Sequence, residues 1–297
     1  MIIIKVMAGL GNQLQQYALY ERFKSLEIPV RLDTSWYHEN RKAYTKRNME
    51  LTLFPTLTYE IATKEQKAEL LGSENGLFAK IKNKIIGNPF HYMENGRMYL
   101  PEIFSMQDAY LEGYWACEAY YHDIMPILQT KLHFAESELP QNVELLAKLQ
   151  SENAVSVHLR RGDYLQPENV ELFSGICTDA YYETAIRWVR EHCDNPHFYI
   201  FSDDTAYARQ QYRGEEYTIV DWNTGDNSCY DMQLMSRCKH NICANSTFSF
   251  WGARLNPNQG KIVIRPLQHR NNQTCIPAEM HELWQGFTFI DAQGKMV

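Results

Sequence analysis

Short β-rich runs alternate with helical patterns through the second half of this 297-residue chain. AVSVHLR (154–160) alternates apolar and polar residues as a strand does, and DAYYETAIRWVREHC (179–193) repeats apolar residues at helical spacing. A chain that alternates strand and helix in this way favours a parallel sheet covered by helices on both faces. This pattern therefore constrains the fold class to α/β.

The other expected elements continue the same order. Strands are expected at 197–204, 216–222, 240–244 and 261–265, and helices at 205–212, 228–238 and 247–255. In the first half we expect strands in IIIKVM, PVRLD and AYLEGYW, and helices at about 12–26, 62–71, 78–86 and 125–132. We predict two α/β domains, residues 1–145 and 146–297, with a hinge in 136–144 and a cleft at the carboxyl ends of the strands.

Charge and composition exclude several classes of protein. The formal net charge of −7, without a basic run, argues against nucleic acid as a partner. The apolar stretch at the amino terminus is too short for a secretion signal, and no segment approaches the roughly 18 apolar residues of a membrane span. We therefore expect a cytoplasmic protein without a transmembrane segment, and peripheral association with a membrane stays open. Seven cysteines without a C-x-x-C pair fit reduced thiols.

Motifs that hold metal ions are missing from the sequence. The ten histidines show no H-x-x-x-H or H-E-x-x-H spacing, and the adjacent acids of FSDD (201–204) do not make a D-x-D motif. Asp204 can instead cap the helix that follows it. We expect no metal cofactor, so that arginines and a helix dipole must meet the charge of any bound diphosphate.

Three expected strands of the second half end in polar clusters, HLRRGDY, FSDD and ANSTFS. Ligands of open parallel sheets bind outside these carboxyl ends. The alternation in AVSVHLR predicts one buried face, which includes Val155, and places His158 and Arg160 on the other face. Arg160 and Arg161 are then either a solvated strand end or an anion site.

The ANSTFS cluster also begins a helix. Ser246 or Thr247 is an ordinary N-cap there, and the same helix start offers free N–H groups and a positive dipole end to a phosphate. Two guanidiniums and a helix start at one point would form a diphosphate cradle. Asp231, in the first turn of the preceding helix, is either a surface acid or an acceptor for the adjacent N–H donors of guanine.

The amino-terminal stretch AGLGNQL lacks the third glycine of the dinucleotide-binding fingerprint. Its glycines, including Gly11, leave a turn without β-carbons that a ligand can approach closely. Asn12 either caps the first helix or faces the cleft.

Three segments, GLGNQLQQYA, HLRRGDYL and DMQLMSRCKHNICANSTFSFWGARL, resemble in order and spacing the α-1,2-fucosyltransferases of bacteria and animals, glycosyltransferase family 11. LEGYWACEAYY and FYIFSDD are also similar to their counterparts in that family. The resemblance covers nearly the whole chain. It implies a GT-B fold of two Rossmann-like domains, GDP-fucose bound by the second, a galactose-terminated glycan as acceptor, inversion at the anomeric carbon and no required metal.

The resemblance also implies roles for residues at the strand ends. Arg160 matches an arginine that contacts the donor β-phosphate, and His158 lies in the donor pocket. Arg161 either supports Arg160 or holds Asp163 through a salt bridge. Asp163 is the first candidate for the general base, followed by Glu168, and a dissociative reaction needs little help from either.

Other roles implied by the resemblance lie further along the chain. Asn12 resembles an asparagine that reaches toward the phosphate and the fucose, with Gly11 beside it. Asp231 resembles an acid that reads the guanine edge. The donor pyrophosphate is wrapped by a loop matching Asn245, Ser246 and Thr247.

Two other functions fit the same sequence. A transferase for another nucleotide sugar would keep the arginines and change the contacts to the base and the sugar. A carbohydrate-binding protein without catalysis would use aromatic residues for stacking, which leaves the two arginines and the helix-start hydroxyls unexplained.

Overall fold

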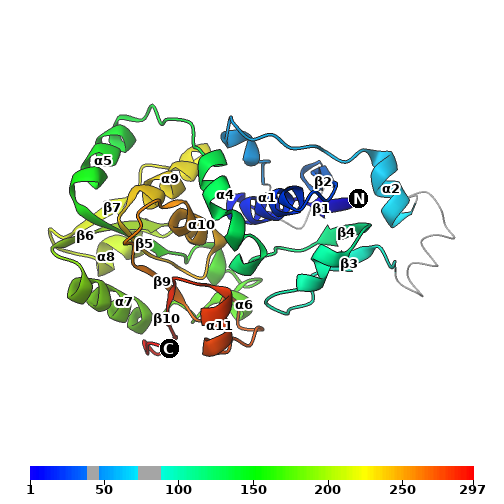
Figure 1. Ribbon diagram of the computed structural model, residues 1–297. Helices are drawn as coiled ribbons and strands as arrows, with labels where there is room; N and C mark the ends of the chain where they lie inside the picture. Colours follow the sequence, from blue (N-terminus) through cyan, green and yellow to red (C-terminus); the bar gives the residue numbers. More distant parts are fainter. Residues whose placement is uncertain (39–46, 73–87) are drawn as a thin grey trace. The chain divides into compact units, whose positions relative to one another are not determined.

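The computed structural model describes residues 1–38, 47–72 and 88–297, in two compact units, Met1–His133 and Phe134–Val297 (Figure 1). Each unit is built on its own parallel sheet. This confirms the predicted α/β fold class and shows two units, each with a parallel sheet of its own. The helix expected at 78–86 falls outside the described residues.

The first unit carries a four-stranded sheet in the order β2-β1-β4-β3, and its described pairings are parallel. Its strands are β1 (Ile2–Lys5), β2 (Val30–Asp33), β3 (His91–Met93) and β4 (Ala109–Glu112). Its helices are α1 (Leu10–Ser25), α2 (Lys64–Leu71) and α4 (Met125–Lys131). The fully buried isoleucines of β1 suit a central strand with neighbours on both sides.

The second unit carries a six-stranded sheet in the order β10-β9-β8-β5-β6-β7, again with parallel pairing of its strands. Its strands are β5 (Asn153–Leu159), β6 (Pro196–Ser202), β7 (Tyr217–Val220), β8 (His240–Ile242), β9 (Val263–Pro266) and β10 (Thr288–Ile290). Its helices are α5 (Pro140–Ser151), α6 (Val170–Phe173), α7 (Asp179–His192), α8 (Thr205–Gln211), α9 (Cys229–Arg237), α10 (Thr247–Leu255) and α11 (Pro277–Leu283).

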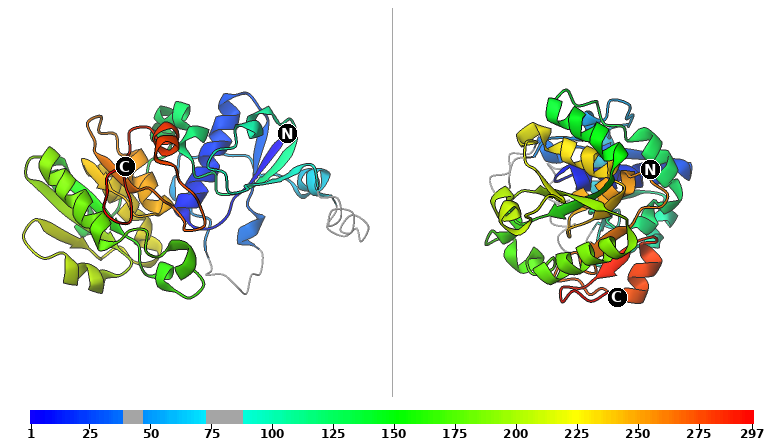
Figure 2. Two further views of the ribbon diagram at one scale, coloured as in Figure 1. Left: turned by 90° about the horizontal axis from the view of Figure 1, so that it is seen from below. Right: turned by 90° about the vertical axis from the view of Figure 1, so that its left-hand side faces the viewer.

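Helices cover both faces of the second sheet, with α7 on one side and α5 and α9 on the other (Figures 1 and 2). Val155 packs in the core beneath α7, as predicted. Ser156 and His158 point to the opposite face but are only 2% and 5% exposed. The expectation of a single buried face was therefore wrong, because the helices on the second side bury the polar positions of β5 as well.

The strand order of the second unit creates a switch point next to β5. From β5 the chain continues to β6 and β7 on one side, and it then crosses back to place β8, β9 and β10 on the other side. Ligands of open α/β sheets bind at the carboxyl ends of the strands beside such a switch point, which here are the ends of β5 and β8. Two of the three predicted polar clusters, HLRRGDY and ANSTFS, span the exits of these two strands.

The boundary between the units lies after His133, earlier in the chain than the boundary placed at 145 by the sequence. The reason is α5, which begins at Pro140 inside the expected hinge. Leu145 and Leu149 of this helix pack in one core with Leu234 of α9. This helix therefore belongs entirely to the second unit.

Candidate active site

Arg160 leaves β5 at the switch point and is held between two carboxylates. Its Nη2 donates to Oδ2 of Asp163 at 2.7 Å, and its Nη1 lies 3.1 Å from Oδ2 of Asp203. Asp203 follows β6, so these ion pairs join the loops of two neighbouring strands. The Arg160 side chain stays 25% exposed. The guanidinium is thus held in one orientation and remains open to solvent at the carboxyl end of the sheet.

Gly162 explains how the loop after β5 can approach Asp203 so closely. The backbone N–H of Arg161 donates to Oδ1 of Asp203 at 2.8 Å. A β-carbon at position 162 would lie 2.9 Å from Oδ2 of Asp203. Any side chain at this position would therefore push Asp203 away from Arg160.

Arg161 turns toward α8 and away from Asp163. Its Nε lies 3.3 Å from Oδ2 of Asp204, and its guanidinium stacks 3.6 Å from the ring centre of Tyr207. The suggested Arg161–Asp163 salt bridge is therefore wrong, because Arg160 takes Asp163 as its partner. Asp204 also caps α8 by accepting from the N–H of Tyr207, as predicted.

His158 is buried at the end of β5 beside Phe248 of α10, with 5.8 Å between the ring centres. Burial, with the nearby charge of Arg160, lowers the pKa of this imidazole to about 3. His158 Nδ1 has no hydrogen-bond partner among the described residues. The neutral ring therefore offers a nitrogen next to the switch point.

The loop after β8 is tied firmly to the rest of the unit by Asn245. Asn245 Nδ2 donates to the carbonyl oxygens of Phe173 and His269, at 3.2 Å each, and its Oδ1 accepts from the thiol of Cys177. The hydroxyl of Tyr164 donates to the Asn245 carbonyl at 2.9 Å and so links the loops of β5 and β8 across the switch point. The Asn245 side chain is therefore used to position this loop.

The next two residues begin α10. Ser246 is the N-cap, and its Oγ accepts from the N–H of Phe248, which confirms the predicted cap. Thr247 is the first helical residue and is partly exposed. The dipole end of α10 and the Thr247 hydroxyl therefore lie at the same switch point as Arg160.

Asp231 lies in the first turn of α9, the helix that crosses from β7 to β8. Its Oδ1 accepts from Nδ2 of Asn223 at 2.8 Å. Burial raises the pKa of Asp231 to about 7, although the bond from Asn223 works in the opposite direction. Asp231 is therefore not a fully solvated surface acid, which was one of the two roles that its sequence position allowed.

In the first unit, α1 begins within the GLGNQ segment, and one of the two roles expected for Asn12 was that of helix cap. The N-cap is Gly9, and Asn12 lies one turn later, so Asn12 does not cap the helix. Gly11 is a buried helical position next to it. Ala8, just before the turn, has a φ of 66°, a left-handed conformation that costs an alanine roughly 1 kcal/mol. The carbonyl of Ala8 is held by Gln13 Nε2 at 3.0 Å.

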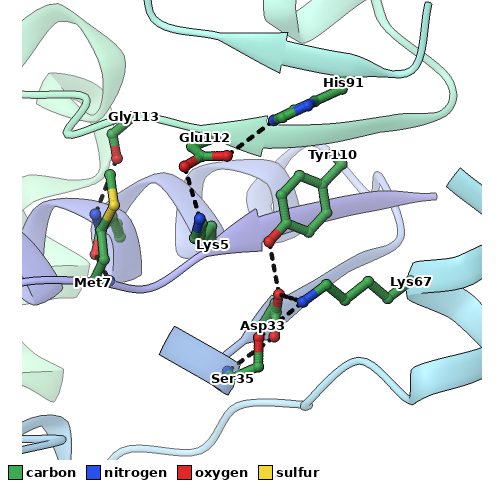
Figure 3. A network of polar contacts seen from close by, with 10 residues as sticks. Lys5, Met7, Asp33, Ser35, Lys67, His91, Tyr110, Glu112 and Gly113 are labelled. Carbon is green, nitrogen blue, oxygen red and sulfur yellow. Dashed lines mark hydrogen bonds and ion pairs between the residues drawn. The ribbon is translucent and has the colours of Figure 1, made fainter. Parts of the chain in front are cut away.

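Polar contacts that the sequence did not reveal connect the carboxyl ends of β1 and β4 (Figure 3). Lys5 and His91 both contact Glu112, at 2.7 and 2.9 Å. The hydrogen bond from His91, together with Lys5, lowers the pKa of Glu112 to about 2. Gln16 of α1 accepts from the N–H of Met7 and donates to the carbonyl of Gly113, which follow β1 and β4.

Asp33, the last residue of β2, receives a hydrogen bond from Tyr110 at 2.7 Å and lies 2.9 Å from Lys67 (Figure 3). Burial alone would raise the pKa of Asp33, but the bonds from Tyr110, Lys67 and Ser35 outweigh it and lower the pKa. The loops at this edge are therefore anchored to the sheet by ionised side chains.

The described residues contain neither a metal-binding cluster nor a helix that could span a membrane. Across 1–38, 47–72 and 88–297, no group of three or more His, Cys, Asp or Glu side chains could hold a metal ion. Within the same residues, no helix is long and apolar enough to cross a lipid bilayer.

The family model of glycosyl transferase family 11 matches residues 83–287, more than half of the chain. A glycosyltransferase of O-antigen biosynthesis from Escherichia coli is 30% identical, over 87% of this chain and 91% of that protein. The chain belongs to glycosyl transferase family 11. This confirms the resemblance inferred from the sequence.

Other relatives of this family 11 glycosyltransferase have more specific names. An alpha-1,2-colitosyltransferase from Escherichia coli is 30% identical over 89% of this chain and 91% of that protein. A galactoside alpha-(1,2)-fucosyltransferase 2 from Oryctolagus cuniculus is 24% identical over 85% of this chain and 66% of that protein. A solved structure of NodZ alpha-1,6-fucosyltransferase aligns with a TM-score of 0.47 at 14% identity, over 93% of this chain and 98% of that one.

The second unit of the family 11 enzyme therefore gathers most of the predicted donor residues. Arg160 and the start of α10 lie at the exits of β5 and β8, with His158 beside them. Asn12 and Gly11 belong to the other unit, at the exit of its β1. The sequence placed Tyr164 and Asp203 in polar clusters without a role of their own and did not point to Asn223, because the importance of all three comes from contacts with other loops.

Gly162→Ala should lower glycosyl transfer about tenfold, because the new methyl group displaces Asp203 and frees Arg160 to move. Steady-state kinetics would measure the loss, and urea unfolding would show whether stability falls in parallel. Gly260→Ala is the matched control, since a β-carbon there meets nothing within 4 Å. Wild-type kinetics in Gly162→Ala would contradict this account of the loop.

Proposed function

We propose that this family 11 enzyme transfers L-fucose from GDP-fucose to the 2-hydroxyl of a galactose in a glycan acceptor, with inversion and without a metal ion. The observation that carries the proposal is the oriented Arg160 guanidinium at the exit of β5, while α10 begins after the neighbouring strand β8. A planar cation and free helix N–H groups are the groups that bind a diphosphate. The names of the relatives, which include galactoside α-1,2-fucosyltransferases, support the donor sugar and the linkage.

The proposed reaction is a direct displacement at the anomeric carbon. The 2-hydroxyl oxygen of galactose forms the new bond as the bond from the anomeric carbon to the β-phosphate oxygen breaks. GDP leaves with the electron pair, and the hydroxyl proton passes to a base or to water. Arg160 and the α10 dipole stabilise the negative charge that grows on the β-phosphate, which removes the need for a metal ion. Asn245 holds the loop that presents Ser246 and Thr247 to the same phosphates.

The first candidate base, Asp163, is bound by Arg160 through its Oδ2. This contact uses one carboxylate oxygen to hold the guanidinium, which gives Asp163 a positioning role. Glu168 lies five residues further on, in an exposed turn that Asn169 ties to the carbonyl of Asp163 at 2.9 Å. We therefore propose that Asp163 orients Arg160 and that Glu168 acts as the general base.

A second candidate donor carries colitose, because one relative is named an alpha-1,2-colitosyltransferase. Transfer of colitose would use the same phosphate contacts and differ only around the sugar. The acceptor is proposed to be a growing surface polysaccharide with a terminal galactose, since another relative belongs to O-antigen biosynthesis.

An acceptor screen tests the proposed function. The purified enzyme is incubated with GDP-fucose or GDP-colitose and a panel of galactosides, with and without EDTA, and the linkage is read by NMR. We expect an α-1,2-linked product that is unaffected by EDTA. UDP- and ADP-sugars serve as donor controls, and absence of transfer to every galactoside would overturn the proposal.

Arg160→Ala should lower kcat/KM for GDP-fucose by about 10²- to 10³-fold, because a donor to the developing charge is removed. Arg160→Lys keeps the charge but cannot bridge two carboxylates with a planar fork, so it should recover only part of the loss. Arg190→Ala, an exposed arginine paired with Glu216, is the control for the loss of a charged side chain. Near-normal turnover by Arg160→Ala would rule out the phosphate contact.

Asp163→Asn and Glu168→Gln should separate orientation from proton transfer. Glu168→Gln should lower kcat at least about 10²-fold and leave KM for GDP-fucose nearly unchanged. Asp163→Asn should chiefly raise KM for GDP-fucose, because it loosens Arg160. The reverse pattern would make Asp163 the base.

A further inference from the structure

A pair of buried asparagines lies behind Asp231 in the second unit. Asn142 Nδ2 donates to Asn223 Oδ1 at 2.9 Å, and Asn223 Nδ2 donates back to Asn142 Oδ1 at 3.0 Å. Asn223 Nδ2 also donates to Oδ1 of Asp231 at 2.8 Å. The side chains of Asn142 and Asn223 are 0% and 8% exposed and form a reciprocal amide pair. From this pair, Asn223 donates one hydrogen bond outward, to Asp231.

The orientation of both amides is fixed by their neighbours. The indole Nε1 of Trp222, which can only donate, bonds Asn142 Oδ1 at 2.7 Å. Asn142 must therefore present its oxygen to Trp222 and Asn223, and its Nδ2 to Asn223 and to Ser137 at 2.8 Å. The side-chain oxygen of Asn223 therefore faces Asn142. One N–H of Asn223 Nδ2 bonds Asn142, and the other points at Asp231.

These contacts connect Asp231, the candidate residue for recognising the guanine of the donor, to the first part of the second unit. Asn142 lies in the first turn of α5, which packs with α9 in one core (Figure 1). We propose that Asn223, fixed by Asn142, is a positioning residue that orients the Asp231 carboxylate toward the adjacent N–H donors of the donor's purine base. This inference rests on the proposed function.

The electrostatics of Asp231 give the positioning a measurable consequence. Its pKa is raised to about 7 by burial, and Asn223 lowers it. Below that pH the carboxyl gains a proton and can no longer accept two hydrogen bonds from N–H donors of guanine. Without Asn223 the pKa rises further, so the ionised form should become scarce at neutral pH.

The causes of this pKa shift are burial and the hydrogen bond from Asn223. Titratable groups on the elements around α9 include Glu144 and Lys148 on α5, Cys229, Tyr230 and Arg237 on α9, Arg254 on α10, and Asp221 after β7. Asp221 is paired with Arg209.

The test compares pH profiles of kcat/KM for GDP-fucose, which report the pKa values of the free enzyme. The wild type should show an acid limb with its midpoint near 7. Asn223→Leu should move this limb up by about one pH unit, which lowers kcat/KM about fivefold at pH 7 and little at pH 9. If Asn223→Leu does not fold, Asn223→Ser, which is too short to reach Asp231, carries the same expectation.

Two controls separate positioning from stability and from the proposed function. Asn256→Leu removes another buried asparagine, which bonds Asn241, and it should lower stability without moving the acid limb. GDP should inhibit the wild type better than inosine diphosphate, which lacks the 2-amino group, and Asp231→Asn should reduce that preference. A loss in Asn223→Leu that is uniform across pH would overturn the inference, whereas a wild type that neither binds GDP nor uses GDP-fucose would overturn the proposed function itself.

Discussion

The ion pairs of Arg160 with Asp163 and Asp203 join the loops that leave β5 and β6. The geometry of the site depends on them, because they turn a long, flexible side chain into a fixed fork at the end of the central strand. β5 supports this arrangement by pairing with β6 along its whole length and with β8 on its other side. Gly162 completes it by leaving room for the Asp203 carboxyl.

The charge balance at this edge affects how it can bind an anion. Arg160 and Arg161 face three carboxylates, Asp163, Asp203 and Asp204, so the arginines alone do not make a positive pocket. Their carboxylate partners fix the guanidiniums and also compete with a phosphate for them. The start of α10 therefore matters for affinity, because its dipole and free N–H groups attract an anion without a counter-ion of their own.

Periodicity predicted the elements that repeat a pattern over many residues, such as β5 and α7. The three-residue strands β3 and β10 carry too few positions for a period to show, and they form because their neighbours pair with them. Helix α5 was hidden because it begins at Pro140, directly after a short acidic stretch typical of a linker, although Leu145 and Leu149 recur at helical spacing.

The site was predicted in its residue types and less well in its contacts. Strand alternation gave the side of β5 on which His158 lies, but it could not choose between Arg160 and Arg161 as the partner of Asp163. That choice depends on Asp203 and Asp204, which arrive from the next strand. The Asn142–Asn223 pair joins residues 81 positions apart, and neither belongs to a motif with a recognisable spacing.

Buried amides hold the loops in place around both sheets. Gln16 ties the exits of β1 and β4 in the first unit, and Asn245 ties three loops in the second. A neutral amide with its hydrogen bonds satisfied costs far less to bury than a charge, and it holds two backbone groups at fixed separation. Positioning by amides leaves the ionised groups at the loop ends available for a charged substrate. Asp231 differs from these ionised groups, because its burial makes its charge depend on a single amide partner, Asn223.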